Sequence, residues 1–351
     1  MTASSPSPSP PRPIDLEALA VALRALRTFG DLRFEELAPL ADGGTMHRHV
    51  RIGARGWLAR LPTASSFGLR PRARLRLEAA IFRRLAPSGR TPMLGAVIAP
   101  SVALPTGLLV VREIVGRPAR VPEDLPALAE TLAAVHRLPT PPSERWMPIG
   151  HDHDPIAGRV RLVRRHLSEM AAAPLSPIVR AALDDELAWA MRLAADHAVL
   201  PDPTLALVDS HPGNFVIDRT GHAIFIDLDH AFYGQRTIDI AYASLPSSIR
   251  WSLPDAPVPD REDVLAFERA WLSALPSGLA DRERPWLRPM RRLTWLRQIV
   301  WFARGWAFGK AGTSGRAHAA AYRERALAML TPEAIDRMRA EWIGPTALPP
   351  P

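Results

Sequence analysis

The sequence LALVDSHPGNFVID, residues 205–218, places an Asp, a His, a Gly and an Asn in one short segment between two apolar runs. A second apolar run, AIFIDLDHAFYG at residues 223–234, contains two further aspartates. Asp and Asn beside Gly and Pro are ordinary turn residues, so a plain hairpin connection would explain the first motif by itself. The second acidic motif, so soon after the first, favours a site built from oxygen atoms.

The residue types in these motifs suit phosphoryl transfer. That reaction needs a carboxylate to orient and deprotonate an attacking hydroxyl, and oxygen ligands to hold magnesium against a nucleoside triphosphate. Asp209 and Asn214 would supply a base and an amide oxygen from one loop, while Pro212 and Gly213 shape the turn. Asp227 ends the next short strand, so its carboxylate could reach the same metal.

The residues before this loop predict a small β-rich unit. Apolar spacing predicts helices over residues 14–30 and 70–89. Short β-like runs predict an antiparallel sheet from residues 34–40, 47–52, 56–61, 95–99 and 107–115. Gly and Pro residues then mark a linker from about Gly116, beyond which helical patterns dominate.

This order of motifs resembles the aminoglycoside phosphotransferase and choline kinase family, whose fold is protein-kinase-like. LVDSHPGN matches the family's catalytic loop, and FIDLDHA matches its metal-binding strand. The resemblance implies that Asp209 is the catalytic base and that Asn214 and Asp227 bind magnesium, with Asp229 as the second acidic position of the metal motif. It also implies an α+β fold, with a small antiparallel β-rich N-lobe and a larger α-rich C-lobe that meet at the active site.

The resemblance extends to residues that support the loop. Asp239, in GQRTIDIAYAS, matches the family's Asp that braces the catalytic loop from behind. His211 belongs to the loop signature, where structural hydrogen bonding is a better role than proton transfer. We therefore expect both residues to hold the loop rather than to react.

The N-lobe motifs imply a nucleotide site. ADGGTMHRHVRI resembles the hairpin over the phosphates, with Gly43 and Gly44, although a plain turn would look the same. Arg60 takes the place of the family's phosphate-binding Lys, and Glu78 is its expected partner unless it is a solvated charge on a basic helix face. LLVVREIVGRPAR, with Glu113, resembles the adenine-contacting hinge. ATP and magnesium are the implied cofactors.

We expect four segments from these patterns. Residues 1–12 form a disordered Ser/Pro tail, residues 13–115 the nucleotide-binding N-lobe, residues 116–344 the catalytic and substrate-binding C-lobe, and residues 345–351 a second disordered tail.

Two departures from the family pattern leave a second function open. Leu207 and Val208 stand where the family has His-Gly before the Asp, and Arg60 stands where it has Lys. A guanidinium is planar and bulkier than an ammonium group, so the phosphate geometry can change. The alternative is a catalytically impaired, nucleotide-binding pseudoenzyme.

Composition limits the remaining classes. The formal net charge is +8, but the basic residues are spread along the chain, so we expect no nucleic-acid partner. No apolar run reaches the roughly 18 residues that span a membrane, no signal peptide is recognisable and Cys is absent, so we expect no membrane partner and a cytoplasmic protein. We expect a monomer or homodimer.

The acceptor stays open among amino alcohols, thiamine, sugars and antibiotics such as macrolides and aminoglycosides. An aromatic box for a quaternary amine could come from Trp295 and Trp301, although their helical spacing also fits a core. The acidic run PDAPVPDREDV, residues 254–264, would suit a polycation. GHDHDP, residues 150–155, suggests either a metal site or a helix that Asp154 caps.

Overall fold

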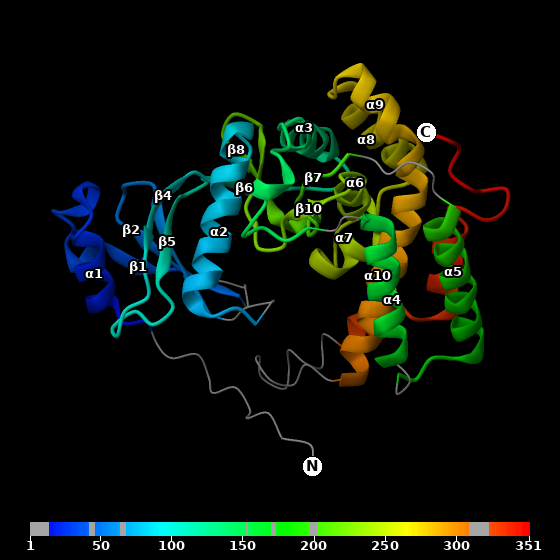
Figure 1. Cartoon of the computed structure of the whole chain (residues 1–351), viewed down its shortest axis with the longest axis horizontal. Helices are drawn as coiled ribbons and strands as arrows, with labels where there is room; N and C mark the ends of the chain where they lie inside the picture. The colour runs from blue at the N-terminus through cyan, green and yellow to red at the C-terminus, as the bar shows by residue number, and fades with distance from the viewer. Residues whose placement is uncertain are drawn as a thin grey trace, which may run out of the picture. The chain divides into compact units, whose positions relative to one another are not determined.

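The computed structural model describes residues 14–41, 46–63, 68–151, 154–169, 173–196, 202–308 and 323–351. The chain divides into two compact units, Met1–Gly116 and Arg117–Pro351 (Figure 1). The N-terminal Ser/Pro segment, for which we expected disorder, lies outside the described residues.

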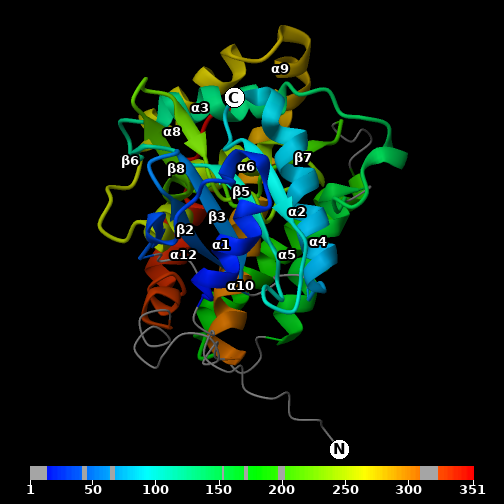
Figure 2. The same cartoon turned by 90° about the vertical axis from the view of Figure 1, so that its left-hand side faces the viewer.

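The first unit is built on a five-stranded antiparallel sheet with the strand order β1-β2-β3-β5-β4. In sequence order the strands are β1 (Leu37–Pro39), β2 (His47–Ile52), β3 (Trp57–Pro62), β4 (Leu94–Ile98) and β5 (Leu108–Arg112). Helices α1 (Leu16–Arg24) and α2 (Pro71–Leu85) lie on opposite sides of this sheet (Figures 1 and 2).

The apolar run of β5 explains why both faces of the sheet are covered. Successive strand residues point to opposite faces. Leu108 and Val110 join the core cluster that contains Leu19 and Leu23 of α1. Leu109 is equally buried and points to the other face, the one that α2 covers, so a continuous rather than an alternating apolar pattern is needed here.

The second unit carries small sheets within a helical body. One sheet has the order β6-β8-β9, from β6 (Gly116–Pro118), β8 (Phe215–Asp218) and β9 (Ala223–Phe225), and another pairs β7 (Thr204–Ala206) with β10 (Phe232–Gly234). The surrounding helices are α3 (Leu125–His136), α4 (Pro155–Glu169), α5 (Pro177–Asp196), α6 (Thr237–Ser244), α7 (Pro246–Ser252), α8 (Arg261–Ser273), α9 (Ser277–Glu283), α10 (Leu287–Phe308) and α12 (Pro332–Arg339).

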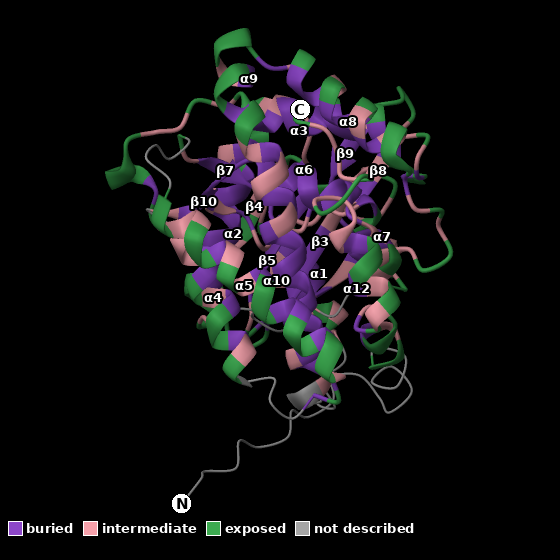
Figure 3. Ribbon diagram, turned by 90° about the vertical axis from the view of Figure 1, so that its right-hand side faces the viewer, coloured by how far each residue is buried: buried purple, intermediate pink, exposed green. Residues whose placement is uncertain are grey.

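The core of the second unit lies around α6 and α10. Every residue of α6 is buried, and α10 contributes the largest group of residues to the main apolar cluster. Figure 3 shows the buried α6 within this unit and the exposed outer surface of α9. Because α6 also carries Asp239, the loop-bracing residue expected from the sequence is anchored in the most buried helix of the unit.

The closing residues 345–351, expected to be disordered, make hydrogen bonds. The amide of Leu348 donates to the carbonyl of Glu341 at 2.7 Å, and the guanidinium of Arg288 donates to the carbonyl of Pro349 at 2.9 Å. The acceptors in these hydrogen bonds are backbone carbonyl groups. Every residue type has such a group, so a Pro-rich composition does not predict the bonds. Within the described residues, no helix combines the length and apolarity that crossing a bilayer requires.

Candidate active site

The loop between β7 and β8 is closed by the side chain of Asn214. Its amide nitrogen donates to the carbonyl oxygen of Asp209 at 2.8 Å, and its backbone amide donates to the carbonyl of His211 at 2.9 Å. The amide nitrogen of Ile226 donates to the carbonyl of Asn214 at 2.9 Å. Asp227 directly follows Ile226, so the two predicted metal ligands Asn214 and Asp227 come from chain segments that are bonded to each other.

Asp239 holds the same loop through its carboxylate. Its Oδ2 accepts the backbone N–H of Leu207 at 2.8 Å, and its Oδ1 accepts that of Val208 at 2.7 Å. The hydroxyl of Ser210 donates to the carbonyl of Asp239 at 2.9 Å. Asp239 is fully buried, so these bonds replace the water that a carboxylate would otherwise require.

His136, at the end of α3, completes this buried network and was not identified from the sequence. The indole Nε1 of Trp271 donates to Nδ1 of His136 at 3.1 Å, and Nε2 of His136 lies 2.9 Å from Oδ2 of Asp239. Indole is a donor only, so the proton of the neutral ring lies on Nε2 and is donated to Asp239. Burial lowers the pKa of His136 from its usual 6.5, although the nearby Asp239 opposes this effect.

Val208 has a backbone conformation that β-branched residues rarely adopt. Its φ is +70°, in the left-handed region that glycine enters without steric cost. Val208 therefore adopts a conformation that favours glycine, and it stores strain directly before Asp209. His211 lies farther along the loop, with its Nε2 3.8 Å from Oδ1 of Asp209, beyond hydrogen-bonding distance.

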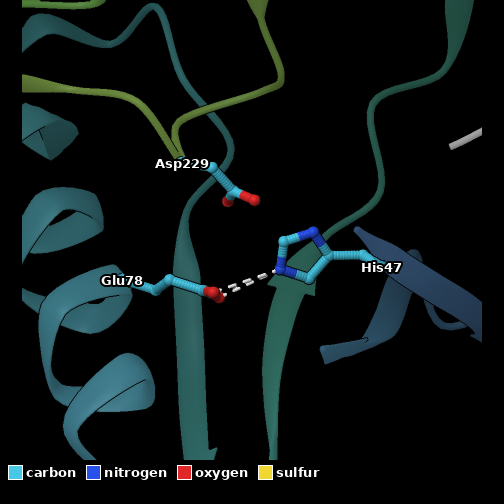
Figure 4. Close-up of side chains that lie close together, drawn as sticks. All are labelled: His47, Glu78 and Asp229. Atoms are coloured by element: carbon cyan, nitrogen blue, oxygen red, sulfur yellow. Dashed lines mark hydrogen bonds and ion pairs between the residues drawn. The ribbon is translucent and has the colours of Figure 1, made fainter. Parts of the chain in front are cut away.

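In the first unit, Glu78 on α2 contacts two residues other than Arg60, its predicted partner. Arg74, one turn earlier, donates to it at 2.6 Å, and Nε2 of His47 lies 3.2 Å from each of its carboxylate oxygens (Figure 4). Burial raises the pKa of Glu78, but the hydrogen bond from His47 and the charges of His47, Arg60 and Arg74 outweigh it, and the pKa lies below 4.5. Glu78 is therefore a buried carboxylate rather than a solvated charge.

Glu113 follows β5, and both its carboxylate and its amide are engaged. Arg51 donates to the carboxylate through Nε at 2.9 Å and Nη2 at 2.6 Å. The amide of Glu113 donates to the carbonyl of Gly56 at 2.9 Å. Gly43 and Gly44, the predicted cover over the phosphates, lie outside the described residues.

A pocket of about 220 Å³ opens beside Asp209 in the second unit. Trp301 of α10 lines it, together with Tyr242 of α6 and Trp251 of α7. Trp295, the other predicted substrate contact, is fully buried and packs against Trp342 with ring centroids 5.1 Å apart. The structure therefore corrects the pairing of the two tryptophans: Trp295 is a core residue, and Trp301 faces the pocket.

The remaining acidic and His-containing motifs are explained mainly by helix capping. Asp260 caps α8, and its carboxylate accepts the amide of Asp263 at 2.9 Å, in a reciprocal arrangement of the two residues. Asp154 caps α4 by accepting the amides of Ile156 and Ala157 at 3.0 and 2.9 Å, which confirms the capping interpretation of GHDHDP. Residues 152 and 153 of that motif lie outside the described part of the chain.

Comparison with known proteins agrees with this architecture. The model of a family described as phosphotransferase enzymes matches residues 36–288. A choline/ethanolamine kinase family protein from Mesorhizobium loti has a similar structure, with a TM-score of 0.59 and 18% identity over 93% of this chain and 99% of that chain. No curated protein matches the sequence.

Two antibiotic-modifying enzymes also have similar structures. An aminoglycoside 2′-phosphotransferase-IIIa, solved as its GDP complex, has a TM-score of 0.62 and 14% identity over 92% of this chain and 99% of that chain. A macrolide 2′-phosphotransferase from Brachybacterium faecium has a TM-score of 0.56 and 18% identity over 91% of this chain and 99% of that chain. The predicted α+β, protein-kinase-like fold is confirmed.

Proposed function

Because the chain belongs to the phosphotransferase enzyme family, we propose that it transfers the γ-phosphoryl group of ATP to a hydroxyl group of a small molecule. One observation carries the proposal: Asn214 bonds both to the carbonyl of Asp209 and to the amide that precedes Asp227. These hydrogen bonds hold Asp209, Asn214 and the segment before Asp227 together, and this would bring a base and two oxygen ligands into one small region of the chain.

The donor set fits a hard cation such as magnesium. The amide nitrogen of Asn214 is committed to Asp209, so its oxygen is the atom available as a ligand. Together with the carboxylates of Asp227 and Asp229 it would form an all-oxygen site. When bound there, magnesium would neutralise the charge of the triphosphate.

Asp209 would act on the acceptor. Its carboxylate orients the acceptor hydroxyl and takes its proton while the hydroxyl oxygen forms a bond to the γ-phosphorus. The bond from that phosphorus to the bridging oxygen of ADP breaks, and ADP leaves with the electron pair. Asp239 and His136 would fix the loop that presents Asp209, without contact with the reacting atoms.

The first unit would bind the nucleotide. Arg60 would neutralise phosphate charge, with Glu78 fixing its position, and Gly43 and Gly44 would cover the phosphates. The carboxylate and amide of Glu113 are engaged, so its contact with the base would come from its carbonyl oxygen. Magnesium, a cytoplasmic location and a monomeric or homodimeric state stay predictions.

The loop geometry favours turnover over the impaired alternative. Asp239 holds the loop through the backbone N–H groups of Leu207 and Val208, which do not depend on the side chains at these positions. Replacement of the family's His-Gly therefore leaves the bracing bonds in place.

The test is ADP release from MgATP and MgGTP, with and without pooled amino alcohols, thiamine, sugars, macrolides and aminoglycosides. We expect acceptor-dependent release that Asp209→Asn abolishes. The exposed Asp281→Asn serves as the matched control and should retain it. Tight binding of MgATP without release for any of these acceptors would instead favour the pseudoenzyme or an acceptor outside the pool.

A further inference from the structure

We propose that the acceptor is a small anionic alcohol with a planar apolar ring, and that Arg297 binds its anionic group. The inference rests on the proposed function, since the pocket that carries it adjoins Asp209. The sequence leaves cationic, neutral and antibiotic molecules open as acceptors, and this inference reduces that range to one chemical class.

Arg297 differs from the arginines that precede it on α10. Arg288 pairs with Glu268, Arg291 with Glu341 and Arg292 with Glu186, at 2.5–2.6 Å. Each of the three arginines that precede Arg297 on this helix is therefore paired with a carboxylate.

Arg297 itself has no carboxylate partner among the described residues. Its guanidinium donates to the hydroxyl of Tyr242, and its buried Nε makes no hydrogen bond in the described part of the chain. The side chain lines the pocket beside Asp209. An incompletely paired guanidinium facing a pocket suits a carboxylate or phosphate group of a ligand.

The aromatic walls disfavour a cationic acceptor. Trp251 and Trp301 meet edge to face, with ring centroids 5.7 Å apart, and both line the pocket. Arg325 lies over the ring of Trp251 at 5.0 Å, and Arg297 lies 5.8 Å from the ring centre of Tyr242. An ammonium group would therefore compete with two arginines for these rings and be repelled by both.

The other charged and polar groups around the pocket agree with this assignment. Asp209 is the sole carboxylate that lines it among the described residues, and the proposed reaction uses that group for the hydroxyl. In the described part of the chain, the titratable groups on its wall besides Asp209, Arg297 and Tyr242 are His211 and His230. Gln298 completes the polar wall, and Ser247 and Ser248 fix its amide with bonds of 2.5 and 2.6 Å.

The size of the pocket limits the acceptor further. Its volume of about 220 Å³ lies below the range of roughly 300–1,000 Å³ that is usual for sites of drug-sized ligands. A macrolide or an aminoglycoside would not be enclosed. A single ring can pack against Trp301 while its substituents reach Arg297 and Asp209, so a one-ring alcohol fits the chemistry of the walls.

Three para-substituted benzyl alcohols test the inference, because they share the ring and the hydroxyl and differ only in charge. They are para-(hydroxymethyl)benzoate, the corresponding benzamide and the corresponding benzylamine. Binding is measured by tryptophan fluorescence and by calorimetry on the full chain, and transfer by ADP release from MgATP. Inorganic phosphate, as a competitor, distinguishes a phosphate-binding from a carboxylate-binding site.

The benzoate should bind at least about tenfold more tightly than the benzylamine, with the benzamide between them. Arg297→Gln should remove this preference, Arg297→Glu should reverse it, and Arg250→Gln, at an exposed position of α7, should leave it unchanged. Tighter binding of the benzylamine, no binding of the benzoate, or an unchanged preference in Arg297→Gln would overturn the inference. Preferred binding of the benzoate without ADP release would support the inference and count against the proposed function.

Discussion

Asp239 accepts the backbone N–H of Val208 at 2.7 Å, at the residue whose φ of +70° turns the chain into Asp209. A fully buried carboxylate therefore holds a strained peptide beside the predicted base. Strain of this kind persists only where the surrounding structure determines the backbone. The bond explains how Val can occupy a position that favours glycine.

Replacement of Asp239 by Asn should destabilise the protein by about 2–5 kcal/mol, because an amide NH₂ would then face backbone N–H donors for which the described residues provide no other acceptor. Urea unfolding followed by circular dichroism measures the change. Asp281→Asn, at an exposed site, should change the free energy of unfolding by less than about 0.5 kcal/mol. Equal effects of the two substitutions would contradict the bracing role.

The strain at Val208 predicts an inverted order of stability. Val208→Ala loses apolar contacts and keeps a positive φ, whereas Val208→Gly also loses the contacts but relieves strain of about 1–3 kcal/mol. The Gly variant should therefore be the more stable by about 1 kcal/mol. At Val163, which is buried in α4, the ordinary order with Ala more stable should hold. Thermal unfolding of the four variants measures both orders of stability. A more stable Val208→Ala than Val208→Gly would show that the backbone at position 208 is not strained.

Asp227→Asn should weaken the dependence of nucleotide binding on magnesium, because a neutral amide replaces an anionic oxygen ligand. The gain in ATP affinity on adding magnesium should fall at least about tenfold, as measured by calorimetry with and without the metal. ATP affinity in EDTA should change little. An unaltered response to magnesium would remove Asp227 from the metal site.

The contiguous parts of the site could be predicted from the sequence. The loop from Asp209 to Asn214 and the strand that ends at Asp227 carry their residue types at fixed short spacing, so the motifs and the fold they imply are recognisable. Asp239 can be recognised from its own motif in the same way, although it lies 32 residues from Leu207, whose backbone N–H donates to it. The hydrogen bonds of this network are properties of the folded structure alone.

Partners that are distant in sequence could not be predicted. His136 is separated from Asp239 by 103 residues, and His47 is separated from Glu78 by 31. No local pattern distinguishes such histidines from others near apolar segments. The sequence does not distinguish the core residue Trp295 from the pocket residue Trp301. Apolar residues occur on several sides of α10, so their periodicity does not show which side faces a pocket.

Substitution of Trp295 should chiefly affect stability, and substitution of Trp301 should chiefly affect use of the acceptor. Trp295→Ala should destabilise the protein by about 3–5 kcal/mol, since the side chain is fully buried. Trp301→Ala should chiefly raise the KM for the acceptor, because its side chain lines the pocket. Chemical unfolding and acceptor titration of both variants test this. A raised acceptor KM in a stably folded Trp295 variant would restore that residue as a substrate contact.

His136 predicts how stability depends on pH. Its pKa in the folded protein is lowered by burial, so between that value and the usual 6.5 the unfolded chain binds more protons than the folded one. The contribution of the neutral ring is therefore present above about pH 6.5 and is lost as the pH falls below it. The free energy of unfolding of the wild type should decrease from pH 7 towards pH 5. His136→Gln, which retains a donor for Asp239 but does not titrate, should be less stable at pH 7 and should lose less on acidification. Parallel pH profiles for the two proteins would show that His136 does not titrate between the folded and unfolded states, and that acidic groups elsewhere cause the decrease.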